Sequence, residues 1–143
     1  LRPAIRHHIG NRDDLVTASF QPLARRYDER AERELGSSPS IDDVVGYLFG
    51  LAYTSGSDVD DQAFNALLGE ARRNDDLATG IRTTYAATID TIADAVRRER
   101  PRLAPAEARA LGYQVLCLGE FNVDMQRLGF AVDWSRARLG HDS

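Results

Sequence analysis

Hydrophobic residues recur in this chain at the spacing of amphipathic helices. Over most of its length an apolar residue returns every three or four positions, and no stretch alternates between apolar and polar residues as a strand would. Clusters of Gly, Pro, Ser and Thr separate the periodic stretches. The pattern therefore predicts an all-α bundle of five to six helices, over residues 11–35, 40–53, 58–73, 74–100 and 105–128, with one or two short turns after Gly129.

Capping residues and prolines set the predicted helix ends. Asn11 and Ser40 each precede acidic residues in a first turn, where the helix dipole favours negative charge. Pro105 suits the first position of the last long helix, because a residue there needs no N–H donor. Pro22 falls inside the first helix and is expected to kink it or restart it.

The helix over residues 105–128 is predicted to be buried on more than one side, because its residues sort into three faces. One face collects small residues that would allow a tight helix–helix seam: Ala108, Gly112, Val115 and Gly119, with Asn122 at its edge. A second face, expected to be core, collects Leu111, Leu118, Phe121 and Met125. A third face collects Tyr113, Cys117, Glu120 and Asp124.

The composition is that of one ordinary globular domain. With 143 residues, of which 43% are hydrophobic and 28% charged, the chain is long enough for a real core. No apolar run approaches the roughly 18 residues needed to span a bilayer, and no secretory pattern opens the chain. Cys117 is the only cysteine, which excludes an internal disulfide and fits a reducing compartment. A cytoplasmic protein without a membrane partner is predicted.

The first twelve residues differ in charge from the rest of the chain. They carry Arg2, Arg6 and Arg12 and no acidic residue, whereas the residues that follow carry 15 arginines against 22 Asp and Glu. Because an acidic body repels nucleic acid, any contact with nucleic acid is expected in this basic stretch alone.

The run from Arg6 to Leu15 resembles the end of the helix-turn-helix in the TetR family of bacterial transcriptional regulators. Its second part, Gly-Asn-Arg-Asp-Asp-Leu at residues 10–15, fits the family's pattern closely. Two positions depart from that pattern, since Arg6 stands where the family usually has Tyr and Ile9 where it usually has Phe. The match spans about a tenth of the chain.

The resemblance implies that residues 1–14 are a remnant of a DNA-binding helix-turn-helix, whose other parts would lie upstream, and that residues 15–143 form a ligand-binding and dimerisation domain. Operator DNA contacts are implied at Arg2, Pro3, Ala4, Arg6, His7 and Arg12. The alternative is that the arginines among them only solvate an exposed end.

A homodimer is implied as well, because the last two long helices of each subunit in such proteins pair into a four-helix bundle. Mapped by order, the interface falls on residues 84–98 and 108–128. The residues expected in it are Ile89, Ile92, Val96, Ala108, Gly112, Val115, Gly119 and Asn122. One self-complementary patch would serve both partners.

A small-molecule effector pocket is predicted in the helical body, because pockets in bundles are mostly apolar with a few polar groups. The candidate lining is Phe49, Tyr53, Phe64, Leu67, Tyr85, Tyr113, Cys117, Glu120, Phe121, Asp124 and Met125. The aromatic residues among them fit an ordinary core equally well. The two acidic residues could instead pair with Arg109 or Arg127 on the surface.

Signals for catalysis or for a bound metal are weak. The histidines are His7, His8 and His141, and neither a zinc-binding spacing nor a Gly-rich phosphate loop occurs. The sequence therefore predicts neither an enzyme nor a cofactor. The function implied by the resemblance is a ligand-responsive repressor of transcription, in which an effector bound in the body shifts the DNA-binding helices. The alternatives are a helical dimerisation or interaction module that binds no DNA and, less favoured, a small helical enzyme.

Overall fold

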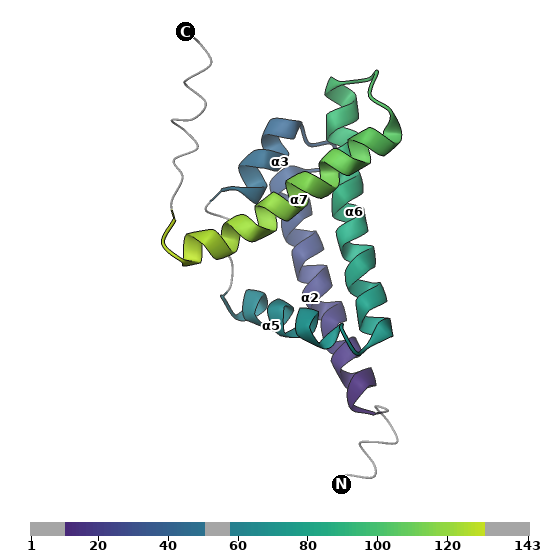
Figure 1. Cartoon of the computed structure of the whole chain (residues 1–143), viewed down its shortest axis with the longest axis vertical. Coiled ribbons are helices and arrows are strands. Elements are labelled where there is room, and N and C mark those ends of the chain that lie inside the picture. Colours follow the sequence, from purple (N-terminus) through teal and green to yellow (C-terminus); the bar gives the residue numbers. More distant parts are fainter. Residues whose placement is uncertain (1–10, 51–57, 131–143) are drawn as a thin grey trace.

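Five α-helices make up the part of the chain that the computed structural model describes, residues 11–50 and 58–130 (Figure 1). They are α2 (Arg12–Leu35), α3 (Ile41–Leu48), α5 (Asp58–Glu70), α6 (Asp75–Glu99) and α7 (Pro105–Arg127). These residues contain no strand, which confirms the all-α prediction. In Figure 1, α2 and α6 run side by side and α7 crosses them, with α3 near one end of this pair and α5 near the other.

α2 and α3 begin at the positions predicted from their capping residues, Asn11 and Ser40. The Asn11 side chain accepts a hydrogen bond from the backbone N–H of Asp14 at 3.0 Å, and the Asp14 carboxylate accepts the Asn11 N–H at 3.2 Å. Ser40 and Asp43 form the same reciprocal pair at the start of α3. Each pair satisfies two backbone donors that the first turn of a helix would otherwise leave without a partner.

The predicted end of the second helix differs in the structure. The second helix ends at Leu48 instead of continuing to residue 53, and the N–H of Gly50 turns back to the carbonyl oxygen of Tyr47. α2 passes through Pro22 as one continuous helix and does not restart there. The predicted turns after Gly129 fall almost wholly in residues 131–143, outside the described residues.

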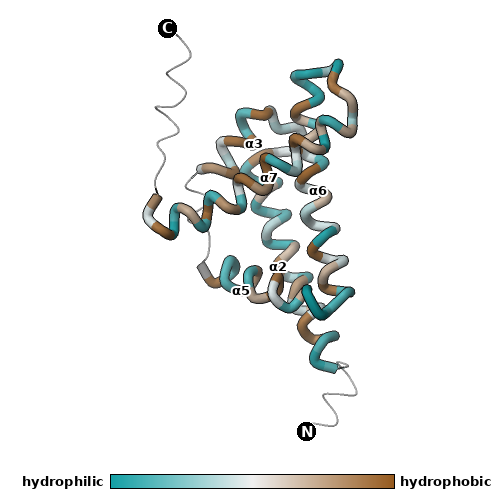
Figure 2. The backbone as a smooth tube through the Cα atoms, viewed as in Figure 1, coloured by the Kyte–Doolittle hydropathy of each residue, from teal (hydrophilic) through white to brown (hydrophobic). Residues whose placement is uncertain are grey.

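The core consists of two clusters that α6 connects. The first half of α6 packs with α2 and α5, in a cluster of Phe20, Leu23, Ala24, Phe64, Leu67, Leu77 and Ile81. The second half packs with α3 and α7, in a cluster of Val44, Leu48, Ile92, Ala93, Ala95, Val96, Ala108 and Leu116. Tyr85 packs against both clusters. Hydrophobic positions accordingly recur along each helix and do not gather in one segment (Figure 2).

The start of α2 is tied to the start of α6 by Asn74, the buried polar residue of the described core. Its side-chain oxygen accepts the N–H of Leu77 at 3.1 Å and so caps α6. Its amide nitrogen donates to the backbone oxygen of Asp13 at 3.1 Å and to the hydroxyl of Thr17 at 3.0 Å. Since these bonds satisfy the buried amide, the two helix starts are held together at this point.

The predicted close packing of the small face of α7 occurs, but its partners are α6 and α3 of the same chain. A Cβ atom at Gly112 would come within 2.7 Å of the Ile89 carbonyl oxygen on α6, and one at Gly119 would come within 3.2 Å of Leu48 Cβ on α3. Ala108 is 0% exposed. Small residues are needed here because the backbones approach closely.

This packing corrects the predicted dimer interface. Of its residues, Ile92, Val96, Ala108, Gly112 and Gly119 are buried against the chain's own helices. Ile89 and Val115 are partly buried against the core, and Asn122 is partly buried too, with an amide nitrogen that has no hydrogen-bond partner. Side chains enclosed by their own chain cannot also form the surface of a second contact.

The face of α7 that was expected to be core is instead turned largely to solvent. Leu111 is 41% exposed, and Leu118 and Phe121 are each 63% exposed. Met125, the fourth residue of that predicted face, is partly buried. The prediction that Leu111, Leu118 and Phe121 are core is therefore wrong, and we refer to these three residues as the outer face of α7.

Candidate functional site

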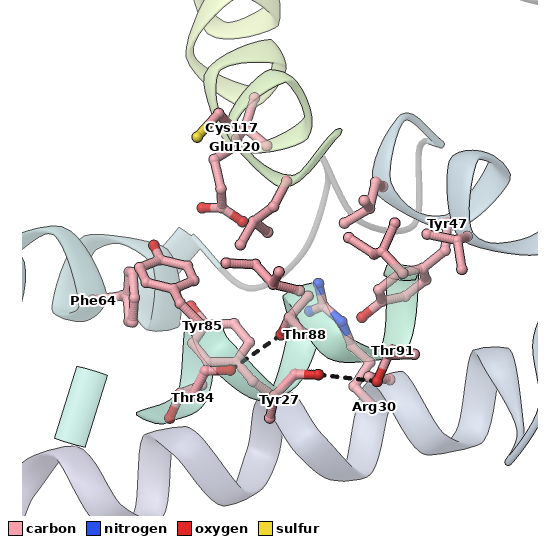
Figure 3. A pocket seen from close by; sticks show the side chains of 18 of the residues that line it. Tyr27, Arg30, Tyr47, Phe64, Thr84, Tyr85, Thr88, Thr91, Cys117 and Glu120 are labelled. Atoms are coloured by element: carbon pink, nitrogen blue, oxygen red, sulfur yellow. Dashed lines mark hydrogen bonds between the residues drawn. The ribbon is translucent and has the colours of Figure 1, made fainter. Parts of the chain in front are cut away.

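A cavity of about 750 Å³ lies among all five helices (Figure 3). Its size is within the range of roughly 300–1,000 Å³ that holds small molecules in proteins. Its lining includes six aromatic side chains: Tyr27, Tyr47, Phe64, Tyr85, Tyr113 and Phe121. We refer to this cavity as the pocket.

One wall of the pocket is built of three aromatic rings from three helices. Phe64 of α5 meets Tyr27 of α2 edge to face, with ring centroids 5.6 Å apart and planes at 86°. Phe64 also meets Tyr85 of α6 edge to face, at 5.7 Å and 88°. Aromatic pairs favour this arrangement, because the positive ring edge faces the negative ring face. The wall therefore has a defined geometry, with Tyr27 and Tyr85 directed to the pocket (Figure 3).

Carboxylates accept hydrogen bonds from the two tyrosines of this wall. The Tyr27 hydroxyl donates to Asp61 at 3.1 Å, and Tyr85 bonds to Glu120 on α7. Burial, and then the neighbouring carboxylate, raises the pKa of each tyrosine well above its usual value. Both phenols are therefore protonated donors throughout the physiological range. Asp61 also pairs with Arg127 at 2.9 Å, which joins α5 to α7.

An arginine and a row of threonines also line the pocket. Arg30 extends from α2 into the pocket and bonds to Tyr47 of α3 (Figure 3). Thr84, Thr88 and Thr91 line the α6 side. Their hydroxyls donate to backbone oxygens one turn earlier, at 3.1 to 3.3 Å. The Arg30 guanidinium, one helical turn from Tyr27, interacts electrostatically with Tyr27 and Asp61, so it lies close to the aromatic wall.

Seven of the predicted ligand residues line the pocket: Phe64, Tyr85, Tyr113, Cys117, Glu120, Phe121 and Asp124. The third face of the last helix is thus the one that borders the pocket. Asp124 also lies 3.9 Å from Arg127, so the predicted surface pairing occurs as well.

The remaining predicted ligand residues are not part of the lining. Leu67 is buried in the α2–α5–α6 cluster, Phe49 packs against the other cluster, and Met125 lies off the pocket. Tyr53 falls outside the described residues.

Sequence reasoning missed the pocket residues of α2 and α3, above all Tyr27, Arg30 and Tyr47. Residues 25–34 alternate in charge, a pattern that is typical of a solvated helix face. A usable signal was present, because Tyr27 and Arg30 continue at helical spacing the stripe that begins with the buried Phe20 and Leu23.

Of the residues implied in DNA contact, Arg2, Pro3, Ala4, Arg6 and His7 lie outside the described residues. The Arg12 guanidinium donates two hydrogen bonds to the Glu70 carboxylate, at 3.1 and 3.0 Å. Together with Arg73 it lowers the pKa of Glu70 to about 2. In this structure Arg12 therefore fastens the start of α2 to the end of α5.

Within residues 11–50 and 58–130, no group of three or more His, Cys, Asp or Glu side chains is arranged to hold a metal ion. None of the helices described is long and apolar enough to cross a membrane. Comparison of the chain with protein-family models, with curated proteins and with solved structures finds no match in any of the three.

Proposed function

We propose that this chain is the effector-binding and dimerisation body of a TetR-like transcriptional repressor that acts in the cytoplasm. The observation that carries the proposal is that α2 forms part of the pocket wall, through Tyr27 and Arg30. α2 is also the helix that follows directly on the basic stretch of residues 1–12. A ligand in the pocket would therefore contact the helix that leads to the DNA-binding end.

The proposed mechanism is a linkage between two sites. A two-fold dimer presents two recognition helices, which must match half-sites about 34–36 Å apart on DNA. An effector that binds more tightly to a state with another spacing weakens operator binding. The loss in operator affinity cannot exceed the difference between the effector's affinities for the two states. Binding, not catalysis, is proposed at the pocket, because a lining of apolar and aromatic side chains with a few polar groups is typical of small-molecule binding sites.

The outer face of α7 is the surface proposed for the homodimer. It is apolar and exposed at Leu111, Leu118 and Phe121, of which Phe121 also borders the pocket. Large apolar side chains exposed on one side of a helix are candidates for an interaction site. α7 remains one of the last two long helices, so the face fits the dimer that the resemblance implies.

DNA binding tests the proposal directly. The protein extended upstream through the implied helices is expected to bind DNA from around its own gene as a dimer, with sequence preference. Binding should weaken steeply as salt rises, because phosphate contacts release counterions. Anisotropy titrations of labelled DNA at several salt concentrations would measure both properties, and scrambled DNA of the same length is the control.

A second candidate is a helical dimerisation or interaction module that binds no DNA. The exposed outer face of α7 favours it, since this face needs a partner under either function. Weak binding that is indifferent to sequence would contradict the repressor and favour the module.

A further inference from the structure

The charge of the pocket lining is strongly unbalanced. Five acidic side chains contribute to it, Asp28, Glu32, Asp61, Glu120 and Asp124, against two arginines, Arg30 and Arg127. The lining thus carries a formal net charge of three negative units near neutral pH. A cavity with walls of low dielectric constant focuses such a charge, so it attracts cations and repels anions.

Two of these carboxylates lie beside the aromatic wall. Tyr85 bonds to Glu120, and Tyr27 donates to Asp61 at 3.1 Å. A phenol that donates to a carboxylate gains electron density on its ring, and the negative face of an aromatic ring attracts a nearby cation. The rings of this wall and the two carboxylates beside it therefore favour the same sign of charge.

The rest of the pocket suits an apolar body. Ile89 and Ile92 of α6 and Leu116 of α7 contribute apolar side chains to the lining. A volume of about 750 Å³ holds a molecule with several rings, much larger than a metal ion or a simple ammonium ion. Arg30, which lies between Tyr27 and Tyr47, opposes a second positive charge beside α2 and α3.

We propose that the pocket binds hydrophobic organic cations, with the positive charge beside Glu120 and the Tyr27–Phe64–Tyr85 wall and the apolar body extending toward Leu116 and Ile92. This inference rests on the proposed function in one respect: it takes the pocket to be the site where the effector binds. The positive charge faces both a carboxylate and ring faces in a partly desolvated site, where each attraction is stronger than in water.

Two probes of the same shape and opposite charge test the proposal. Tetraphenylphosphonium and tetraphenylborate both carry four phenyl rings around a tetrahedral centre. Calorimetric titration of the 143-residue chain at about 0.15 M salt, where exposed charges are screened beyond roughly 8 Å, is expected to give at least about tenfold tighter binding of the phosphonium ion. Equal affinities, tighter binding of the borate, or no binding of either ion would overturn the proposal.

Matched variants then locate the positive charge. Glu120→Gln should weaken phosphonium binding about tenfold, whereas Glu29→Gln makes the same charge change on an exposed position of α2 outside the lining and should leave the affinity unchanged. Arg30→Gln should strengthen phosphonium binding a few-fold, a gain that a folding defect cannot produce. Equal losses in the two glutamate variants would show that the chain's overall charge attracts the cation, which would refute the assigned position.

These results separate this inference from the proposed function, because none of them involves DNA. Phosphonium binding by a protein that shows no sequence-specific DNA binding would refute the repressor and leave the cation pocket intact. Specific DNA binding by a protein whose pocket prefers the borate would refute the cation pocket alone.

Discussion

Replacing Leu118 with glutamate is expected to convert the proposed dimer into a folded monomer. Leu118 is 63% exposed in the single chain, so the substitution costs the monomer little. In a two-fold dimer the same position enters the interface twice, and each copy would bury a carboxylate without a partner. Such a burial costs about 3 kcal/mol or more, which corresponds to a rise of about 100-fold or more in the dimer dissociation constant.

Sedimentation equilibrium over a range of protein concentrations would measure this change. Leu15→Glu is the matched control, because it places the same charge on another exposed leucine, 51% exposed on α2 and outside the outer face of α7. The control should remain dimeric. A dimer that survives Leu118→Glu, or a wild-type chain that stays monomeric at high micromolar concentration, would remove the outer face of α7 from the proposed interface.

The second large effect is expected from Ile92→Ala in the core of the single chain. Ile92 is 2% exposed and belongs to the cluster between α3, α6 and α7. Truncating a buried isoleucine to alanine removes apolar burial and leaves a cavity, which lowers the free energy of unfolding by about 2–5 kcal/mol. Thr83→Ala, at an exposed position on the same helix, should change it by less than about 0.5 kcal/mol.

Urea denaturation in the Leu118→Glu background would measure the loss without a contribution from dimer dissociation. The result distinguishes the observed packing from the interface that the sequence predicted. If Ile92 lay in the dimer interface, its truncation would raise the dimer dissociation constant and leave the stability of the monomer nearly unchanged. An unfolding free energy equal to that of the parent would therefore contradict the core assignment.

Local chemistry made the helix boundaries predictable. Asn11, Ser40 and Asn74 cap the helices that their sequence context predicted, since each side-chain oxygen accepts a backbone N–H within the next turn. Pro105 opens α7 at its first turn for an equally local reason. The early end of α3 at Leu48 was not predictable in this way, because the apolar periodicity continues beyond it.

The direction in which each face of α7 points was not predictable. Periodicity separated the small face, the large apolar face and the polar face correctly, but a helical wheel carries no information on which face meets the rest of the chain. The large face resembled a core, yet Gly112 and Gly119 show that close approach to α6 and α3 took the small face instead. The polar face, with Glu120, then came to border the pocket.

The contribution of α2 to the pocket depended on tertiary packing, because the stripe that includes Tyr27 and Arg30 indicates which side of α2 faces inward but not which helices lie opposite it. Arg30 sits among alternating charges that are typical of a solvated surface, and only the placement of α3 beside it makes it a wall residue. Asp61 likewise became a site residue only because Tyr27 and Arg127 approach it from two other helices. Long-range contacts of this kind have no local sequence signature.

The central claim is that the pocket and the DNA-binding end are coupled through α2. The most direct test measures the affinity of the upstream-extended dimer for its operator as tetraphenylphosphonium is added at constant ionic strength. We predict that phosphonium weakens operator binding, and that Glu120→Gln requires about tenfold more of it for half-release, because its pocket binds the cation more weakly. An operator affinity that stays unchanged at phosphonium concentrations shown by calorimetry to saturate the pocket would contradict the claim.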